Sequence, residues 1–96
     1  MRIVFENFNK NIQTFARDCG YRPLSVNAAG EWNCVKSLAG RDYPRFHMYL
    51  KKEGKAVTAN IHLDQKKPSY EGSSAHGGDY DSEIIADEAR RISTKI

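Results

Sequence analysis

Residues 45–64 read RFHMYLKKEGKAVTANIHLD, and this stretch decides the fold. Two runs of alternating apolar and polar residues flank Glu53-Gly54, a pair that suits a tight turn. We predict an antiparallel hairpin with a two-residue loop at Glu53-Gly54, in which Met48 faces Ala59. One face of this hairpin is then entirely apolar, and it consists of Phe46, Met48, Leu50, Val57, Ala59, Ile61 and Leu63.

The opposite face of the predicted hairpin is polar. It carries Arg45, His47, Tyr49, Lys51, Thr58, Asn60, His62 and Asp64. A slip of the strands by one residue would mix the two sets, so the pattern favours this pairing. His47 is predicted to face Asn60 and to lie diagonal to His62, about 7–8 Å away. Such a hairpin buries one face and leaves the other polar.

The residues before the hairpin are predicted to form three strands and one helix. Short apolar or alternating runs indicate strands at 2–5, 22–27 and 31–38. A helix is predicted at 8–19, with Asn7 or Asn9 as its N-cap and Gly20 just past its end. Its buried face repeats at the spacing of a helical turn through Phe8, Ile12, Phe15 and Ala16.

A long loop and a second helix are predicted after the hairpin. Residues 65–80 contain three Gly, one Pro and three Ser, and a loop of this length is often functional. The helix is predicted at 82–95, with an ion pair between Asp87 and Arg91. Its apolar face is formed by Ile85, Ala89, Ile92 and Ile96. Acidic residues at its start and basic residues at its end complement the helix dipole.

The predicted order of elements is therefore β-α-β-β-β-β-α, in a single α+β domain that spans residues 1–96. Both helices are expected on one side of an antiparallel sheet, because that arrangement covers its apolar face. The composition, with 40% apolar and 28% charged residues, is typical of a folded domain. A chain of 96 residues supports one modest core and excludes an active site between two domains of one copy.

Charge is distributed unevenly along the chain. The net charge is +3, but residues 1–67 carry 12 Lys and Arg against 6 Asp and Glu, whereas 68–96 carry 3 against 6. The basic part suits a polyanion partner, and it suits an ordinary solvated surface equally well. The acidic charge of residues 68–96 is explained by the predicted second helix. It is therefore weak evidence for any function.

The two cysteines, Cys19 and Cys34, do not belong to a C-x-x-C pair. A single disulfide is one interpretation. Because no secretory signal is visible, the simpler one is two reduced thiols that fill space in the core of a cytoplasmic protein. No apolar run approaches the roughly 20 residues of a membrane span, so no membrane partner is expected.

The polar face of the hairpin predicts a first function, RNA binding. Cations and rings on one sheet face meet phosphates and stack on unpaired bases. The candidate RNA-binding residues are Arg45, Tyr49 and Lys51, with Lys66 and Lys67 beyond the hairpin and Lys52 and Lys55 around its turn. His47 and His62 on the same face are candidate catalytic residues, because imidazole acts as a general acid or base near neutral pH.

A second interpretation is a metal site on the same face. His62 and Asp64 would supply two ligands, and the third would be His76 or His47. Two imidazoles and a carboxylate suit Zn or another transition metal such as Fe or Mn. In the RNA-binding interpretation no cofactor is expected. A third alternative is a non-catalytic domain that binds a protein partner through the sheet face or a strand edge.

Gly20-Tyr21 follows the first predicted helix, His47 lies in the first strand of the hairpin, and His62 lies near the end of the second. This run of helix, three-stranded sheet and final helix resembles the HicA-type mRNA-interferase toxins, which have a small double-stranded-RNA-binding-type fold. The resemblance implies that His47 acts as general acid or base while the basic surface holds RNA. The Gly-Ser-His of that family reads Arg45-Phe46-His47 here.

A second resemblance covers more of the chain. Residues 62–70 read HLDQKKPSY and residues 75–80 read AHGGDY, and a Glu-containing helix follows. These segments are similar to an uncharacterised family of short bacterial proteins. The similarity supplies no activity. It implies that the loop from His62 to Tyr80 is one unit, in which a site is expected.

Overall fold

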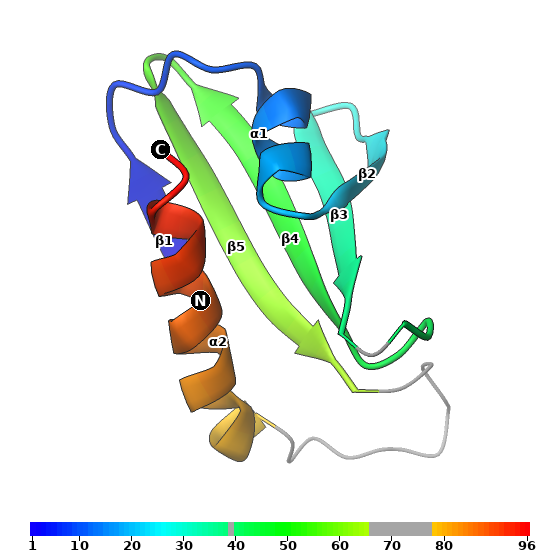
Figure 1. The fold of residues 1–96 in the computed structure, drawn as a ribbon. Coiled ribbons are helices and arrows are strands. Elements are labelled where there is room, and N and C mark those ends of the chain that lie inside the picture. Colours follow the sequence, from blue (N-terminus) through cyan, green and yellow to red (C-terminus); the bar gives the residue numbers. More distant parts are fainter. Residues whose placement is uncertain (39, 66–77) are drawn as a thin grey trace.

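The computed structural model of the chain describes residues 1–38, 40–65 and 78–96, with the side chains of 78–82 left aside. The elements are β1 (Arg2–Phe5), α1 (Ile12–Asp18), β2 (Arg22–Val26), β3 (Glu31–Ser37), β4 (Arg45–Glu53), β5 (Ala56–Asp64) and α2 (Gly78–Ser93). This is the predicted order, β-α-β-β-β-β-α (Figure 1).

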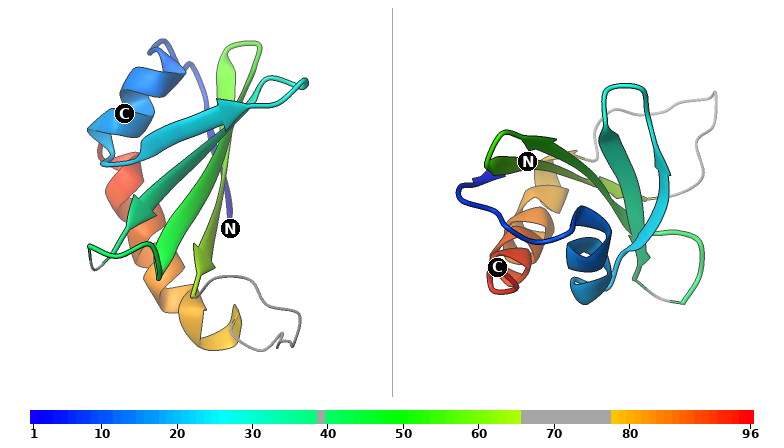
Figure 2. Two further views of the ribbon diagram at one scale, coloured as in Figure 1. Left: turned by 90° about the vertical axis from the view of Figure 1, so that its right-hand side faces the viewer. Right: turned by 90° about the horizontal axis from the view of Figure 1, so that it is seen from above.

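The five strands form one antiparallel sheet in the order β1-β5-β4-β3-β2. The first described strand therefore pairs with the last described one, through the register that sets Arg2 beside Asn60. Both helices lie on the same side of this sheet (Figure 2). We call the side under the helices the covered face and the opposite side the open face.

The turn of the β4–β5 hairpin lies one residue later than predicted. The two-residue loop is Gly54-Lys55, so Met48 faces Ile61 and not Ala59. Gly54 has φ 66°, the left-handed conformation that a type II′ turn requires at its first loop residue. The change moves each partner by two positions, and an even shift keeps every side chain on its predicted face.

The covered face of the hairpin forms the core. Its fully buried side chains are Met48, Leu50, Val57, Ala59 and Ile61. From the helix side, the Phe15 ring of α1 packs edge-on against Phe5 and Phe8, with centroids 5.8 Å and 5.3 Å away. A fully buried Val, Leu, Ile, Phe or Met side chain contributes about 1.5–3 kcal/mol, so the larger members of this cluster stabilise the domain strongly.

Helix α1 begins about one turn later than predicted. Its N-cap is Asn11, and not Asn7 or Asn9. Asn7 instead takes φ 54°, and the backbone N–H of Phe8 donates to the Lys55 carbonyl over 2.7 Å. Phe8, which was predicted to lie in the first turn of the helix, therefore belongs to the connection between β1 and α1. This connection is hydrogen-bonded to the hairpin turn.

Helix α2 begins earlier than predicted, at Gly78, so the expected loop 65–80 is helical over 78–80. The rest of that loop from residue 66 lies outside the described residues. At the other end the helix stops at Ser93, which leaves Ile96 exposed instead of on the apolar face. Neither described helix is long and apolar enough to cross a membrane.

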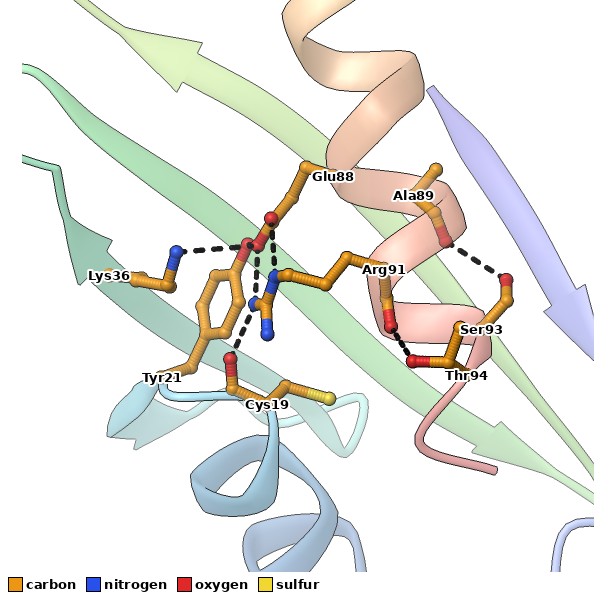
Figure 3. Close-up of polar contacts among 8 residues, drawn as sticks. All are labelled: Cys19, Tyr21, Lys36, Glu88, Ala89, Arg91, Ser93 and Thr94. Carbon is orange, nitrogen blue, oxygen red and sulfur yellow. Dashed lines mark hydrogen bonds and ion pairs between the residues drawn. The ribbon is translucent and has the colours of Figure 1, made fainter.

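A buried polar network ties α2 to the start of β2 (Figure 3). The Tyr21 hydroxyl donates to the Glu88 carboxylate over 2.6 Å, and Arg91 donates to both Glu88 oxygens over 2.8 Å. Arg91 also donates to the Cys19 carbonyl at 2.5 Å, and the Lys36 ammonium lies 4.0 Å from Glu88. The expected pair of Asp87 with Arg91 is thus replaced, since Arg91 turns inward to Glu88.

Burial and hydrogen bonding set the ionisation of this network. Tyr21 and Glu88 are 3% and 5% exposed. Burial, reinforced by the hydrogen bond to Glu88, raises the pKa of Tyr21 far above its usual value. Burial alone would raise the pKa of Glu88, but the hydrogen bonds from Arg91 and Tyr21 lower it below the ordinary value. The carboxylate is therefore held ionised inside the fold.

Cys19 and Cys34 are free thiols with no exposed surface. Cys34 lies on the covered face of β3 and Cys19 at the end of α1, so both fill space in the core as predicted. Burial raises the pKa of each thiol to about 11. Neither is a nucleophile in the native structure, because the thiolate is the reactive form.

Candidate nucleic-acid interface

The open face is the part of the sheet that neither described helix covers. Strand register places on it Arg2 and Val4 of β1; Ala56, Thr58, Asn60, His62 and Asp64 of β5; Arg45, His47, Tyr49, Lys51 and Glu53 of β4; Glu31, Asn33, Val35 and Ser37 of β3; and Arg22 and Ser25 of β2. The eight polar hairpin residues predicted to share a face do so. The other three strands extend that surface on both sides.

His47 is held at both nitrogens. Its Nδ1 lies 3.2 Å from the Asp64 carboxylate, and its Nε2 contacts the Asn33 side-chain oxygen. The Asp64 carboxylate oxygen and the Asn33 amide oxygen both accept hydrogen bonds, so each contact needs a proton on the ring nitrogen that makes it. The side chain is 15% exposed. This imidazole is therefore oriented by its neighbours, and a substrate would have to displace Asn33 to reach Nε2.

His47 faces His62 directly across the β4–β5 pair, instead of the predicted Asn60. Tyr49 joins the two histidines into a ring cluster. Its ring is stacked on His47 with centroids 4.6 Å apart, and it meets His62 at 6.0 Å in an edge contact. His62 is the exposed member of the cluster. The middle of the open face is therefore a patch of aromatic and imidazole rings.

Arg45 and Lys51 lie on either side of the ring cluster along β4. Arg45 Nε is 3.4 Å from the Asp64 carboxylate, and the guanidinium lies 4.7 Å from the centroid of the Tyr43 ring. Lys51 is 3.7 Å from the exposed Glu53 carboxylate. Both pairs are partly open to solvent, where an ion pair contributes little. Each cation can therefore leave its carboxylate partner and bind a phosphate at little cost in free energy.

One row of side chains crosses all five strands through the ring cluster. It consists of Arg2, Asn60, Tyr49, Asn33 and Ser25, each beside the next on the neighbouring strand. Of this row, only Tyr49 is a site residue predicted from the sequence. Strand alternation extended to 31–37 and 2–5 would have placed Asn33 and Arg2 here, but only once the sheet order was known.

The predicted metal site of His62 and Asp64 had two candidate third ligands, His47 and His76. Over residues 1–38, 40–65 and 78–96, no three or more His, Cys, Asp or Glu side chains are placed to hold one metal ion. His47, His62 and Asp64 therefore do not form the three-ligand site that was one expectation. His76, the alternative third ligand, lies outside the described residues. So do Lys66 and Lys67, two of the predicted RNA-binding residues.

No protein-family model, no curated protein and no solved structure matches the chain. The resemblances to HicA-type toxins and to short bacterial proteins therefore stay predictions from the sequence.

Proposed function

We propose that the open face binds single-stranded RNA. The observation that carries the proposal is the position of Tyr49, stacked on His47 and edge-on to His62 in the middle of the face. Sheet faces that bind single strands present rings on which unpaired bases stack. A base that stacks on Tyr49 would extend an existing column of rings, so no new cavity is needed.

The cations of the open face support the same partner. Arg2 and Arg22 are exposed at the two edge strands, and Arg45 and Lys51 lie along β4 beside the rings. This arrangement provides positive charge on both sides of the ring cluster. Phosphates of an extended strand that crosses the sheet would meet cations at its entry and exit, while its bases meet the rings.

The test is RNA binding measured by fluorescence anisotropy, with labelled nine-nucleotide strands at low and moderate salt. Tyr49→Ala should weaken binding by the value of one stacked base, about 1–3 kcal/mol. Tyr49→Phe should bind as the native protein does, because it keeps the ring. The proposal is overturned if the native protein binds no RNA, or if Tyr49→Ala binds as tightly as the native chain.

A matched pair of arginines separates the open face from general attraction. Arg22→Ala removes an exposed cation from the open face, and Arg17→Ala removes one from α1 on the other side. Arg22→Ala should reduce affinity and lower the salt dependence by about 0.7 in the logarithmic slope, the value of one phosphate contact on a single strand. Equal effects of the two substitutions would indicate that only net charge matters.

A specific observation supports cleavage as a second candidate function: His62 is exposed and directly faces His47. In such a reaction His62 takes the proton of a ribose 2′-hydroxyl and the 2′ oxygen attacks the adjacent phosphorus. The bond to the 5′ oxygen breaks, and that oxygen takes a proton from Nε2 of protonated His47, which the substrate reaches by displacing Asn33. A 2′,3′-cyclic phosphate and a 5′-hydroxyl end result.

Cleavage is tested on the same strands, with products separated by length and end group. His62→Ala and His47→Ala should each abolish cleavage, and His62→Ala should leave binding within about threefold of native if Tyr49 supplies the stacking. Cleavage that survives either substitution excludes the two-histidine mechanism. Binding without cleavage leaves the RNA-binding proposal standing alone.

A further inference from the structure

The two asparagines beside Tyr49 differ in their bonding. Asn33 and Asn60 are the partners of Tyr49 on the neighbouring strands β3 and β5. The Asn33 side chain is engaged by His47. The Asn60 side chain makes no hydrogen bond within the described part of the chain. Its neighbours along β5, Ala59 and Ile61, point to the covered face and are fully buried. One amide is therefore committed and the other is available to a ligand.

Position gives the Asn60 amide access to anything stacked on Tyr49. Directly opposite residues of an antiparallel pair have Cβ atoms about 4.5–5.5 Å apart. A nucleobase is wider than this spacing, so one lying on the Tyr49 ring brings an edge within reach of the neighbouring side chain. On the far side of Asn60 in the same row is the exposed cation Arg2, placed to meet a phosphate.

We infer that Asn60 selects the base that stacks on Tyr49, and that the preferred base is adenine. A side-chain amide carries a donor and an acceptor side by side, and it pairs with the N6 amino group and N7 of adenine. In a single strand this edge of the base is free to be read. The inference rests on the proposed RNA binding and adds a base preference to it.

Asn60 contributes differently from its neighbours in the row. Tyr49 gives affinity to every base, because every base has a face to stack. Arg2 gives affinity to every sequence, because each nucleotide has a phosphate. Asn60 alone of the three offers hydrogen bonds that differ from one base edge to another. Base preference should therefore depend on Asn60 and not on the other two.

The test compares nine-nucleotide strands of A, C, G and U for four proteins: native, Asn60→Leu, Arg2→Ala and Asn9→Leu. The native protein should bind the A strand at least about fivefold tighter than the others, the range of one good amide–adenine pair. Asn60→Leu, similar in size, should lose that preference. Arg2→Ala should weaken all four strands alike, and Asn9→Leu, an exposed amide outside the sheet, should change nothing.

Two results overturn the inference. One is a native protein that binds RNA through Tyr49 with no preference for adenine, and the other is the same order of the four strands for Asn60→Leu as for native. Both leave RNA binding itself intact. A native protein that binds none of the strands overturns the proposed function instead. Thermal unfolding of Asn60→Leu, followed by circular dichroism, shows that a lost preference is not a lost fold.

Discussion

The Tyr21 hydroxyl donates a 2.6 Å hydrogen bond to the Glu88 carboxylate, and this contact joins residues that are 67 positions apart. It connects the segment after the first helix to the last helix of the chain. Arg91 completes the link by bridging Glu88 to the Cys19 carbonyl. The network holds α2 against the segment that leads into β2, on the covered face of the sheet.

We predict that Glu88→Ala destabilises the fold by about 3 kcal/mol, since removing one partner of a buried pair leaves the other charge uncompensated. Tyr21→Phe should cost about 1.5–3 kcal/mol, the value of a hydrogen bond to a charged group. Urea unfolding followed by circular dichroism measures both. Asp87→Ala, which removes an exposed carboxylate one residue away, is the control and should change stability by less than about 0.5 kcal/mol. A Glu88→Ala protein as stable as this control would contradict the prediction.

The stabilising effect of Glu88 should depend on pH. Its pKa in the folded protein lies below the ordinary value of 4.5, because Arg91 and Tyr21 donate to the carboxylate. The stabilisation is therefore fully present above about pH 4.5 and is lost as the pH falls through the folded-state pKa. Urea unfolding of the native protein and of Glu88→Gln from pH 7 to pH 3 measures this. The difference in unfolding free energy between the native protein and Glu88→Gln should become smaller toward low pH. A difference that stays constant would refute the lowered pKa of Glu88.

Neither thiol should react in the native protein at neutral pH. Cys19 and Cys34 have no exposed surface, and burial raises the pKa of each to about 11. A thiol-specific chromogenic reagent at pH 7.5 should therefore react only at the rate of unfolding, and should release two equivalents immediately in denaturant. Rapid reaction of one thiol in the folded state would show that its side chain is reached by solvent.

Gly54 should be the most sensitive residue of the hairpin turn. Its φ of 66° disfavours any side chain, whereas the space around it is empty, so the effect of a substitution comes from the backbone alone. Gly54→Ala should cost about 1–2 kcal/mol, and Gly54→Asn less, because Asn enters this conformation more readily. Thermal unfolding measures both variants. An Ala variant as stable as the native chain would mean that the turn adopts another form.

The hairpin shows how far alternation alone predicts a structure. Alternation of period two sorted the side chains of 45–51 and 57–64 onto the correct face, since a face depends only on odd or even position. It could not choose between turns that differ by an even shift. Glu53-Gly54 and Gly54-Lys55 preserve the same faces, and the left-handed conformation of Gly54 as first loop residue decides between them. The error mattered for the site, because it hid the direct pairing of His47 with His62.

The buried network was missed for a different reason. Glu88 stands among Ile85, Ala89 and Ile92 on the inner side of α2, and a charged residue at such a position signals a buried partner. The sequence contained that signal, but the partner Tyr21 is distant in the chain. Similarly, Lys36 lies on the covered face of β3 among apolar neighbours, so alternation alone does not show which side of that strand faces inward. Such pairings become visible only when the sheet order is known.

The pairing of β1 with β5 has a consequence for how the protein is made. Arg2–Phe5 is synthesised before the other described strands, but its partner strand, Ala56–Asp64, follows only after β2, β3 and β4. The apolar side chains of β1 therefore stay unpaired while most of the chain is made, and closing this long loop is slow compared with forming the hairpin. We expect the β4–β5 hairpin to form early and β1 to join it late. Until then, the newly made chain exposes an unpaired edge of β5, where pairing with a second chain competes with folding.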